Sequence, residues 1–121
     1  MANRPPNVIV FMDDQEQAQV CLPGHPCLKP TVDQLIREGL QFTRVYTPTA
    51  HSCPARACYF TGTYPSQNGV FNNVLNPLKI HGSYDPALTH FSEVLRREGW
   101  NLGLTGKWHV SDTEDPSDRG W

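Results

Sequence analysis

The sequence predicts an α/β fold built on a mostly parallel sheet flanked by helices. Three observations support it: short apolar runs typical of buried strands, segments with apolar residues at helical spacing, and the alternation of these two patterns along the chain. Strands that alternate with helices form right-handed βαβ units, in which the strands are parallel. The chain has 121 residues, of which 38% are apolar and 18% charged, as expected for one globular domain.

Three segments are predicted to be strands. Residues 7–12, NVIVFM, form an uninterrupted apolar run between a proline-rich start and two aspartates, as in a strand buried on both faces. Residues 41–46 alternate in a way that favours a second strand, and residues 101–105, NLGLT, are expected to form a third. Ligand sites in such sheets gather at the carboxyl ends of the strands, so the residues that follow these segments are the candidates for function.

Three segments are predicted to be helices. Residues 31–39 place apolar side chains at helical spacing between a threonine cap and a glycine stop. Pro54 is suited to open a helix that runs to about Thr61 and is closed by Gly62. Residues 64–86 are rich in Asn, Gly and Pro and are expected to be mostly loop. Residues 89–98 form an amphipathic helix whose apolar face is expected to contain Phe91, Val94 and Leu95.

The overall charge and the start of the chain give no indication of nucleic acid or membrane partners. The net charge is −2, no run of like charges occurs, and no apolar stretch approaches the length of a membrane span. The start, MANRPPNVIVFMDD, lacks the long apolar region and the cleavage site of a signal peptide. The sequence therefore predicts a cytoplasmic protein, or a periplasmic one if a leader peptide has been removed.

The four cysteines, Cys21, Cys27, Cys53 and Cys58, match neither a zinc-binding spacing nor a dense disulfide framework. Cys21 and Cys27 bracket the loop CLPGHPC, and their spacing allows a bridge between them. Free thiols are favoured, because the chain shows no secretion signal.

Three polar clusters follow the three predicted strands: Asp13-Asp14, then Ser52 to Arg56, then Lys107 to His109. Each alone has an ordinary interpretation as a solvated turn, a helix start with a surface charge, or an exposed loop. Together they place carboxylates, a hydroxyl at a helix N-terminus and cationic side chains at one edge of the predicted sheet. This combination is suited to metal-assisted attack on an anionic ester.

Each cluster has a separate chemical task in that reaction. Asp13 and Asp14 offer hard oxygen ligands for Ca²⁺ or Mg²⁺. Ser52 lies where a helix dipole favours negative charge, and Arg56 offers a planar fork to the nucleophile or the substrate. Lys107 and His109 are suited to neutralise charge on the ester oxygens and the leaving group. If this tail is extended, the two side chains lie on the same side of it.

The motif SCPARACYFTG resembles that of the type I sulfatases, in the alkaline phosphatase superfamily. Their pattern is Cys or Ser, any residue, Pro, any residue and Arg, followed by a helix that ends in TG. Ser52, Pro54 and Arg56 match it in register, which makes Ser52 the reactive residue and Cys53 the variable position. The segments NVIVFMDD and LTGKWHV also resemble the family's, in the same order. Residues 1–121 are thus similar to the N-terminal part of a sulfatase catalytic domain.

The resemblance implies that Ser52 is oxidised to formylglycine, whose hydrate attacks sulfur and later expels sulfate. It implies Asp13, Asp14 and the Ser52 oxygen as metal ligands, Ca²⁺ in the family, and Arg56, Lys107 and His109 as residues that contact the reactive group or the substrate. A serine at this position implies a radical-type maturase as partner and a bacterial source. The implied substrate is a small-molecule or carbohydrate sulfate ester. The family's remaining metal ligands lie far downstream and are absent here, so we expect this chain to be a truncated part of the domain and inactive alone.

Two alternatives stay open. One is a phosphoesterase or phosphonate monoester hydrolase of the same superfamily, because tetrahedral phosphate and sulfate esters need similar metal and cationic contacts. The other is a fragment that binds an anion or a metal without catalysis. Asn72 and Asn73, beyond the motif helix, are candidates for substrate contact, although turn formation explains them as well.

Overall fold

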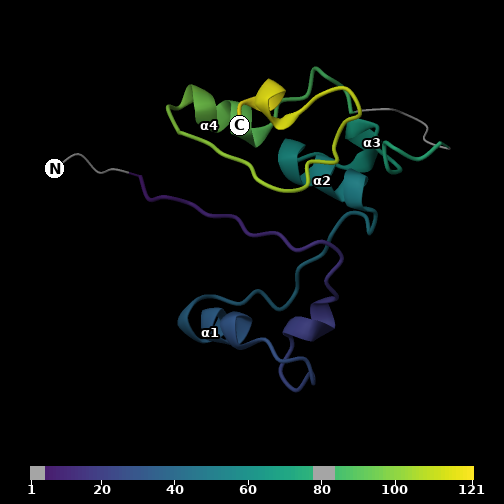
Figure 1. Cartoon of the computed structure of the whole chain (residues 1–121). Coiled ribbons are helices and arrows are strands. Elements are labelled where there is room, and N and C mark those ends of the chain that lie inside the picture. The colour runs from purple at the N-terminus through teal and green to yellow at the C-terminus, as the bar shows by residue number, and fades with distance from the viewer. Residues whose placement is uncertain (1–4, 78–83) are drawn as a thin grey trace. The chain divides into compact units, whose positions relative to one another are not determined.

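The computed structural model describes residues 5–77 and 84–121, which fall in two compact units divided between Thr43 and Arg44 (Figure 1). The loop-rich stretch predicted at residues 64–86 therefore lies partly outside the described residues. Among the described residues, no helix combines the length and the apolar character needed to cross a membrane.

The first unit contains a short 3₁₀ helix, η1 (Ala18–Cys21), and the helix α1 (Pro30–Glu38). α1 is the helix predicted at residues 31–39. It begins at Pro30. Proline suits the first turn of a helix, because the N–H groups of that turn have no acceptor within the helix and the N–H that proline lacks is not needed there. It ends at the predicted glycine, where the Gly39 N–H donates to the Leu35 carbonyl at 2.8 Å.

The apolar run at residues 7–12 is exposed, with Ile9 at 92% and Phe11 at 88% of their maximal accessible surface. This segment forms no strand, and neither do residues 41–46 or 101–105; the part of the chain that the structure describes contains no β-ladder. The described residues thus do not form the three predicted strands. An apolar pattern gives a segment side chains that suit a buried strand. The strand forms only where the backbone N–H and C=O groups of the segment are hydrogen-bonded to a neighbouring strand.

The second unit contains α2 (Ser52–Thr61), the single turn α3 (Pro65–Asn68), α4 (Phe91–Arg97) and the 3₁₀ helix η2 (Pro116–Arg119). α2 begins at Ser52, two residues before the predicted start. It ends at Gly62, whose φ of 70° lies in the left-handed region that glycine adopts without a steric penalty. α4 is the helix predicted at residues 89–98, shortened at both ends.

The core of the second unit is built around α2. Cys53, Ala57 and Phe60 share one face of this helix and are buried. Phe60 joins the surrounding rings: the ring centroids of Trp108, Phe91 and Trp121 lie 5.0, 5.8 and 5.8 Å from its own. The other buried members of the core are Val70, Val74, Tyr84 and Val110.

α4 differs from its prediction in the face that it buries. Val94 is 42% exposed, so the expectation that it belongs to the apolar face is wrong. Ser92 is buried instead, and its hydroxyl donates to the Arg119 carbonyl at 2.6 Å. Phe91 packs against the core cluster. The helix is oriented by this hydrogen bond as well as by its apolar residues, which a count of apolar spacing does not detect.

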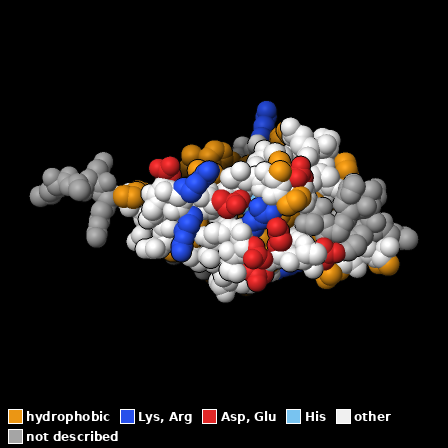
Figure 2. Space-filling view, turned by 90° about the horizontal axis from the view of Figure 1, so that it is seen from above, with side chains coloured by type: hydrophobic (Ala, Val, Ile, Leu, Met, Phe, Trp, Pro, Cys, Tyr) orange, Lys and Arg blue, Asp and Glu red, His pale blue; other side chains and the backbone are white. Residues whose placement is uncertain are grey.

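The charged side chains are mixed on the face shown in Figure 2, where acidic and basic groups lie interspersed with apolar ones. This agrees with the absence of like-charge runs in the sequence.

Candidate functional site

Ser52 is the first residue of α2, and its side chain is partly exposed. The helix begins there because His51 has extended geometry, with ψ of 139°, and its carbonyl accepts from the Ala55 N–H at 3.0 Å. Lys107, 55 residues later, donates from Nζ to Ser52 Oγ at 2.7 Å. The Lys107 ammonium group thus lies within hydrogen-bond distance of the Ser52 hydroxyl at the N-terminus of α2. Both the ammonium group and the helix dipole favour negative charge at the Ser52 oxygen.

Arg56 lies one turn after Ser52 and is partly buried. Its Nη1 donates to the backbone carbonyl of Lys107 at 2.6 Å. This bond holds the main chain of the lysine whose side chain reaches Ser52, a positioning role that the sequence did not suggest. A guanidinium has five N–H donors, so one carbonyl bond does not exhaust its capacity to bind an anion.

Cys53, the other candidate nucleophile by residue type, is fully buried. Burial raises the pKa of its thiol, which keeps the thiol protonated, and Sγ lies 3.7 Å from the Val110 carbonyl to which it donates. A reactive cysteine needs access and a stabilised thiolate. Cys53 therefore lacks the access and the stabilised thiolate of a reactive cysteine, whereas Ser52 is partly exposed.

His109 lies two residues after Lys107, with a φ of 50°. The chain is therefore not extended at this position, so the condition under which alternation would put Lys107 and His109 on the same side is not met. Left-handed geometry is uncommon for residues other than glycine, and such residues cluster at functional sites. The next residue, Val110, is fully buried, so the turn is anchored by the core.

A largely buried ion pair supports the segment that contains Lys107 and His109. Arg119 contacts Glu114 twice, from Nε to Oε2 at 3.0 Å and from Nη2 to Oε1 at 2.7 Å, and the Tyr84 hydroxyl also donates to this carboxylate. Burial alone would raise the pKa of Glu114, but the bonds from Tyr84 and Arg119 lower it, so it stays ionised. Trp108 Nε1 donates to the Glu114 carbonyl at 3.0 Å. The ion pair thereby holds the residue between Lys107 and His109.

His90 is fully buried beneath this segment, and neither of its ring nitrogens is hydrogen-bonded. Its ring centroid lies 4.9 Å from that of Tyr84 and 5.7 Å from that of Trp108, and it is stacked on Phe60. Burial and then the Arg119 cation lower the pKa of His90, so the neutral form is favoured. His90 acts as a packing residue under Trp108.

Asp13 and Asp14 lie in the first unit, at the end of the apolar run, and both are exposed. The chain turns directly after them, where Gln15 has a φ of 64°. A hydrogen bond with Asp13 raises the pKa of Glu16.

These carboxylates fit a hard divalent cation by their donor chemistry. Among the residues that the structure describes, however, no three His, Cys, Asp or Glu side chains are grouped closely enough to hold a metal ion. Asp13 and Asp14 therefore supply at most part of a ligand set.

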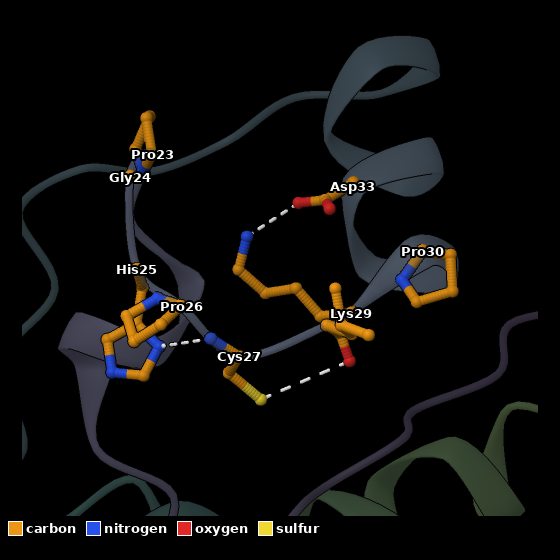
Figure 3. Close-up of a pocket in the computed structure, with 9 residues that line it drawn as sticks. Pro23, Gly24, His25, Pro26, Cys27, Lys29, Pro30 and Asp33 are labelled. Carbon is orange, nitrogen blue, oxygen red and sulfur yellow. Dashed lines mark hydrogen bonds and ion pairs between the residues drawn. The ribbon is translucent and has the colours of Figure 1, made fainter.

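A cavity of about 460 Å³ lies in the first unit between the loop at residues 23–28 and the start of α1 (Figure 3). The side chain of Lys29 points back to Asp33 at 2.6 Å, and His25 Nδ1 accepts from the Cys27 N–H at 3.1 Å. None of the predicted site residues lines this cavity. Its polar groups bond to one another, and Cys27, like the other three cysteines, is a free thiol.

Comparison with known proteins places the chain in a family. The family model described as Sulfatase matches residues 5–118. The chain is 38% identical over 109 residues to Arylsulfatase A from Homo sapiens, covering 88% of this chain and 21% of that protein. It is 31% identical over 107 residues to N-acetylglucosamine-6-O-sulfatase from Bacteroides thetaiotaomicron, covering 87% of this chain and 18% of that protein. No solved structure matches it significantly.

The chain therefore belongs to the sulfatase family, which confirms the resemblance indicated by its three motifs. The family's domain has an alkaline-phosphatase-like α/β fold. The chain spans about a fifth of the length of the curated relatives named above.

Proposed function

We propose that the complete protein hydrolyses an organic sulfate ester and releases inorganic sulfate, with Ser52 as the source of the nucleophile. The observation that carries this proposal is the 2.7 Å contact from Lys107 Nζ to Ser52 Oγ at the N-terminus of α2, in a chain of the sulfatase family. The contact joins two of the three motifs, although 55 residues separate them. Lys107 would neutralise negative charge that develops on the reacting oxygens.

Ser52 is proposed to act as formylglycine, formed when a maturase removes two hydrogens from its side chain. When present, this group supplies an attacking hydroxyl from its hydrate and a route for sulfate release by return to the aldehyde. The partial exposure of Ser52, beside the buried Cys53, supports this assignment. Arg56 would keep Lys107 in place through the Lys107 carbonyl and bind substrate charge with its other N–H groups. His109 is proposed to contact the leaving-group oxygen.

Asp13, Asp14 and the Ser52 oxygen are proposed to hold a divalent cation, Ca²⁺ or Mg²⁺, which would supply positive charge for the reacting oxygens. The hard carboxylate oxygens of Asp13 and Asp14 support this role. We also propose that residues 7–12, 41–46 and 101–105 are strands of the family's sheet. The apolar side chains of residues 7–12 are exposed, and packing in a sheet covered on both faces would bury them.

The substrate is proposed to be a small-molecule or carbohydrate sulfate ester. The relatives' names include an arylsulfatase and an amino-sugar sulfatase, which supports both classes.

The test uses the complete protein, co-expressed with a serine-type maturase. Peptide mass spectrometry is expected to show the loss of two hydrogens at Ser52, and an aryl sulfate is expected to be turned over in proportion to the modified fraction. Ser52→Ala is expected to abolish both signals. A phosphate monoester and a phosphonate monoester are assayed in parallel. Faster turnover of either ester, or full activity with unmodified Ser52, would refute the proposed function.

A further inference from the structure

The first turn of α2 needs an acceptor from outside the helix. The N–H groups at the start of a helix have no partner within it. In α2, Pro54 has no N–H and the Ala55 N–H bonds to the His51 carbonyl, while His51 itself makes no side-chain cap. The Cys53 N–H is satisfied by Asn73, whose Oδ1 lies 3.1 Å away and 20 residues further along the chain.

Asn73 is itself held in place. Its N–H donates to Asn72 Oδ1 at 2.8 Å, and its carbonyl accepts from the Asn76 N–H at 2.9 Å. The next residue, Val74, is 1% exposed and belongs to the core cluster with Cys53. The side-chain amide of Asn73 therefore contacts the first turn of α2 from a loop whose backbone is held by hydrogen bonds and by the burial of Val74.

The Cys53 side chain continues the same connection. Its sulfur donates to the Val110 carbonyl at 3.7 Å and is hydrogen-bonded by the backbone of Val74. Val110 directly follows His109. Cys53 thus connects three segments: the start of α2, the loop with Asn73, and the segment that contains Lys107 and His109. It does so from the position next to Ser52.

We infer that Asn73 is a positioning residue for Ser52, and that it acts through the Cys53 N–H. The bond fixes the first turn of α2 to the Asn73 loop, and the Cys53 sulfur connects the same turn to the segment that contains Lys107 and His109. Ser52 Oγ thereby stays within reach of Lys107 Nζ. This inference rests on the proposed function, because it takes Ser52 as the reactive residue. It assigns Asn73 to the helix rather than to the substrate, so Asn73 serves kcat and not substrate binding.

The test compares Asn73→Ala, Asn73→Asp and the exposed control Asn101→Ala in the complete protein. Asp keeps an oxygen acceptor for the Cys53 N–H but adds a negative charge, which would repel an anionic ester if residue 73 contacted it. Three quantities are measured: the amide hydrogen exchange rate at Cys53, and kcat and KM for an aryl sulfate, with kcat normalised to the fraction of Ser52 converted to formylglycine.

For Asn73→Ala we expect Cys53 exchange to accelerate about five- to tenfold, as for a lost hydrogen bond, and kcat to fall by roughly tenfold or more with KM unchanged. Asn73→Asp should retain most of the wild-type exchange protection at Cys53 and most of the wild-type kcat, and Asn101→Ala should change neither the exchange rate nor kcat. A rise in KM without a fall in kcat, or a loss of activity in Asn73→Asp equal to that in Asn73→Ala, would show substrate contact and overturn the inference. If the wild-type protein is inactive, the proposed function fails, and unchanged Cys53 exchange in Asn73→Ala still refutes the capping bond.

Discussion

Replacing Lys107 by alanine should separate catalysis from stability. The change removes the ammonium group 2.7 Å from Ser52 Oγ, but the Lys107 carbonyl that accepts from Arg56 belongs to the backbone and remains. The bond from Trp108 Nε1 to the Glu114 carbonyl and the burial of Val110 also keep the segment in place. Because Lys107 is exposed, we expect the free energy of unfolding to change by less than about 1 kcal/mol.

The rate should change far more. Loss of one preorganised donor to a developing charge costs about 10²- to 10³-fold in kcat, or about 2.7–4 kcal/mol of transition-state stabilisation. The assay is steady-state hydrolysis of an aryl sulfate by the complete protein, with Ser52 conversion and the thermal midpoint measured on the same samples. Lys107→Gln tests the charge at similar length, and Arg97→Ala is an exposed cationic control. If Lys107→Ala retained wild-type kcat at equal Ser52 conversion, or if its loss of activity followed unfolding, the assignment would be wrong.

Two further predictions concern the packing that holds the site. Phe60→Ala removes the α2 ring that contacts Phe91 of α4 and Trp108, and should lower the free energy of unfolding by about 3–5 kcal/mol in a denaturant titration. Tyr59, the adjacent residue, is 42% exposed and serves as the control. An equal loss of stability in Tyr59→Ala would contradict this prediction. His90 should make stability depend on pH, because burial lowers its folded-state pKa below the ordinary value of about 6.5. Its neutral ring stabilises the fold fully above that value, and the contribution is lost as pH falls toward the folded-state pKa, by up to about 1.4 kcal/mol per pH unit. Thermal midpoints measured from pH 8 to 5 should fall less steeply for His90→Phe than for the wild type, and parallel curves would refute the role of His90.

The helix ends could be predicted from sequence because their causes are local. Gly62 ends α2 through its own backbone conformation, and Pro30 opens α1 through its missing N–H. The motif register likewise made Ser52 the candidate nucleophile without any knowledge of packing. Strand pairing could not be decided in the same way, because it depends on a second segment and the apolar pattern of residues 7–12 does not specify one.

Some residues that support the candidate site are not indicated by any sequence pattern, because they act through contacts with residues far away in the chain. The sequence indicates a turn or a substrate contact for Asn73, and nothing near it in sequence indicates that it caps a helix that begins 21 residues earlier. Glu114 and Arg119 lie in an ordinary polar stretch, and their importance comes from burial beside Tyr84. The left-handed geometry of His109 stands directly before Val110, which is buried in the core, and no local sequence signal marks it.

The sequence by itself determined the family, the order of the three motifs and the local ends of the helices, because each depends on residues that are neighbours in the chain. Only the tertiary structure decided that Lys107 reaches Ser52 across 55 residues, that Cys53 is buried while Ser52 is partly exposed, and that His90 packs under Trp108. These contacts bring together segments far apart in the chain, and their geometry is set by how the core around Phe60 packs, which no local pattern encodes.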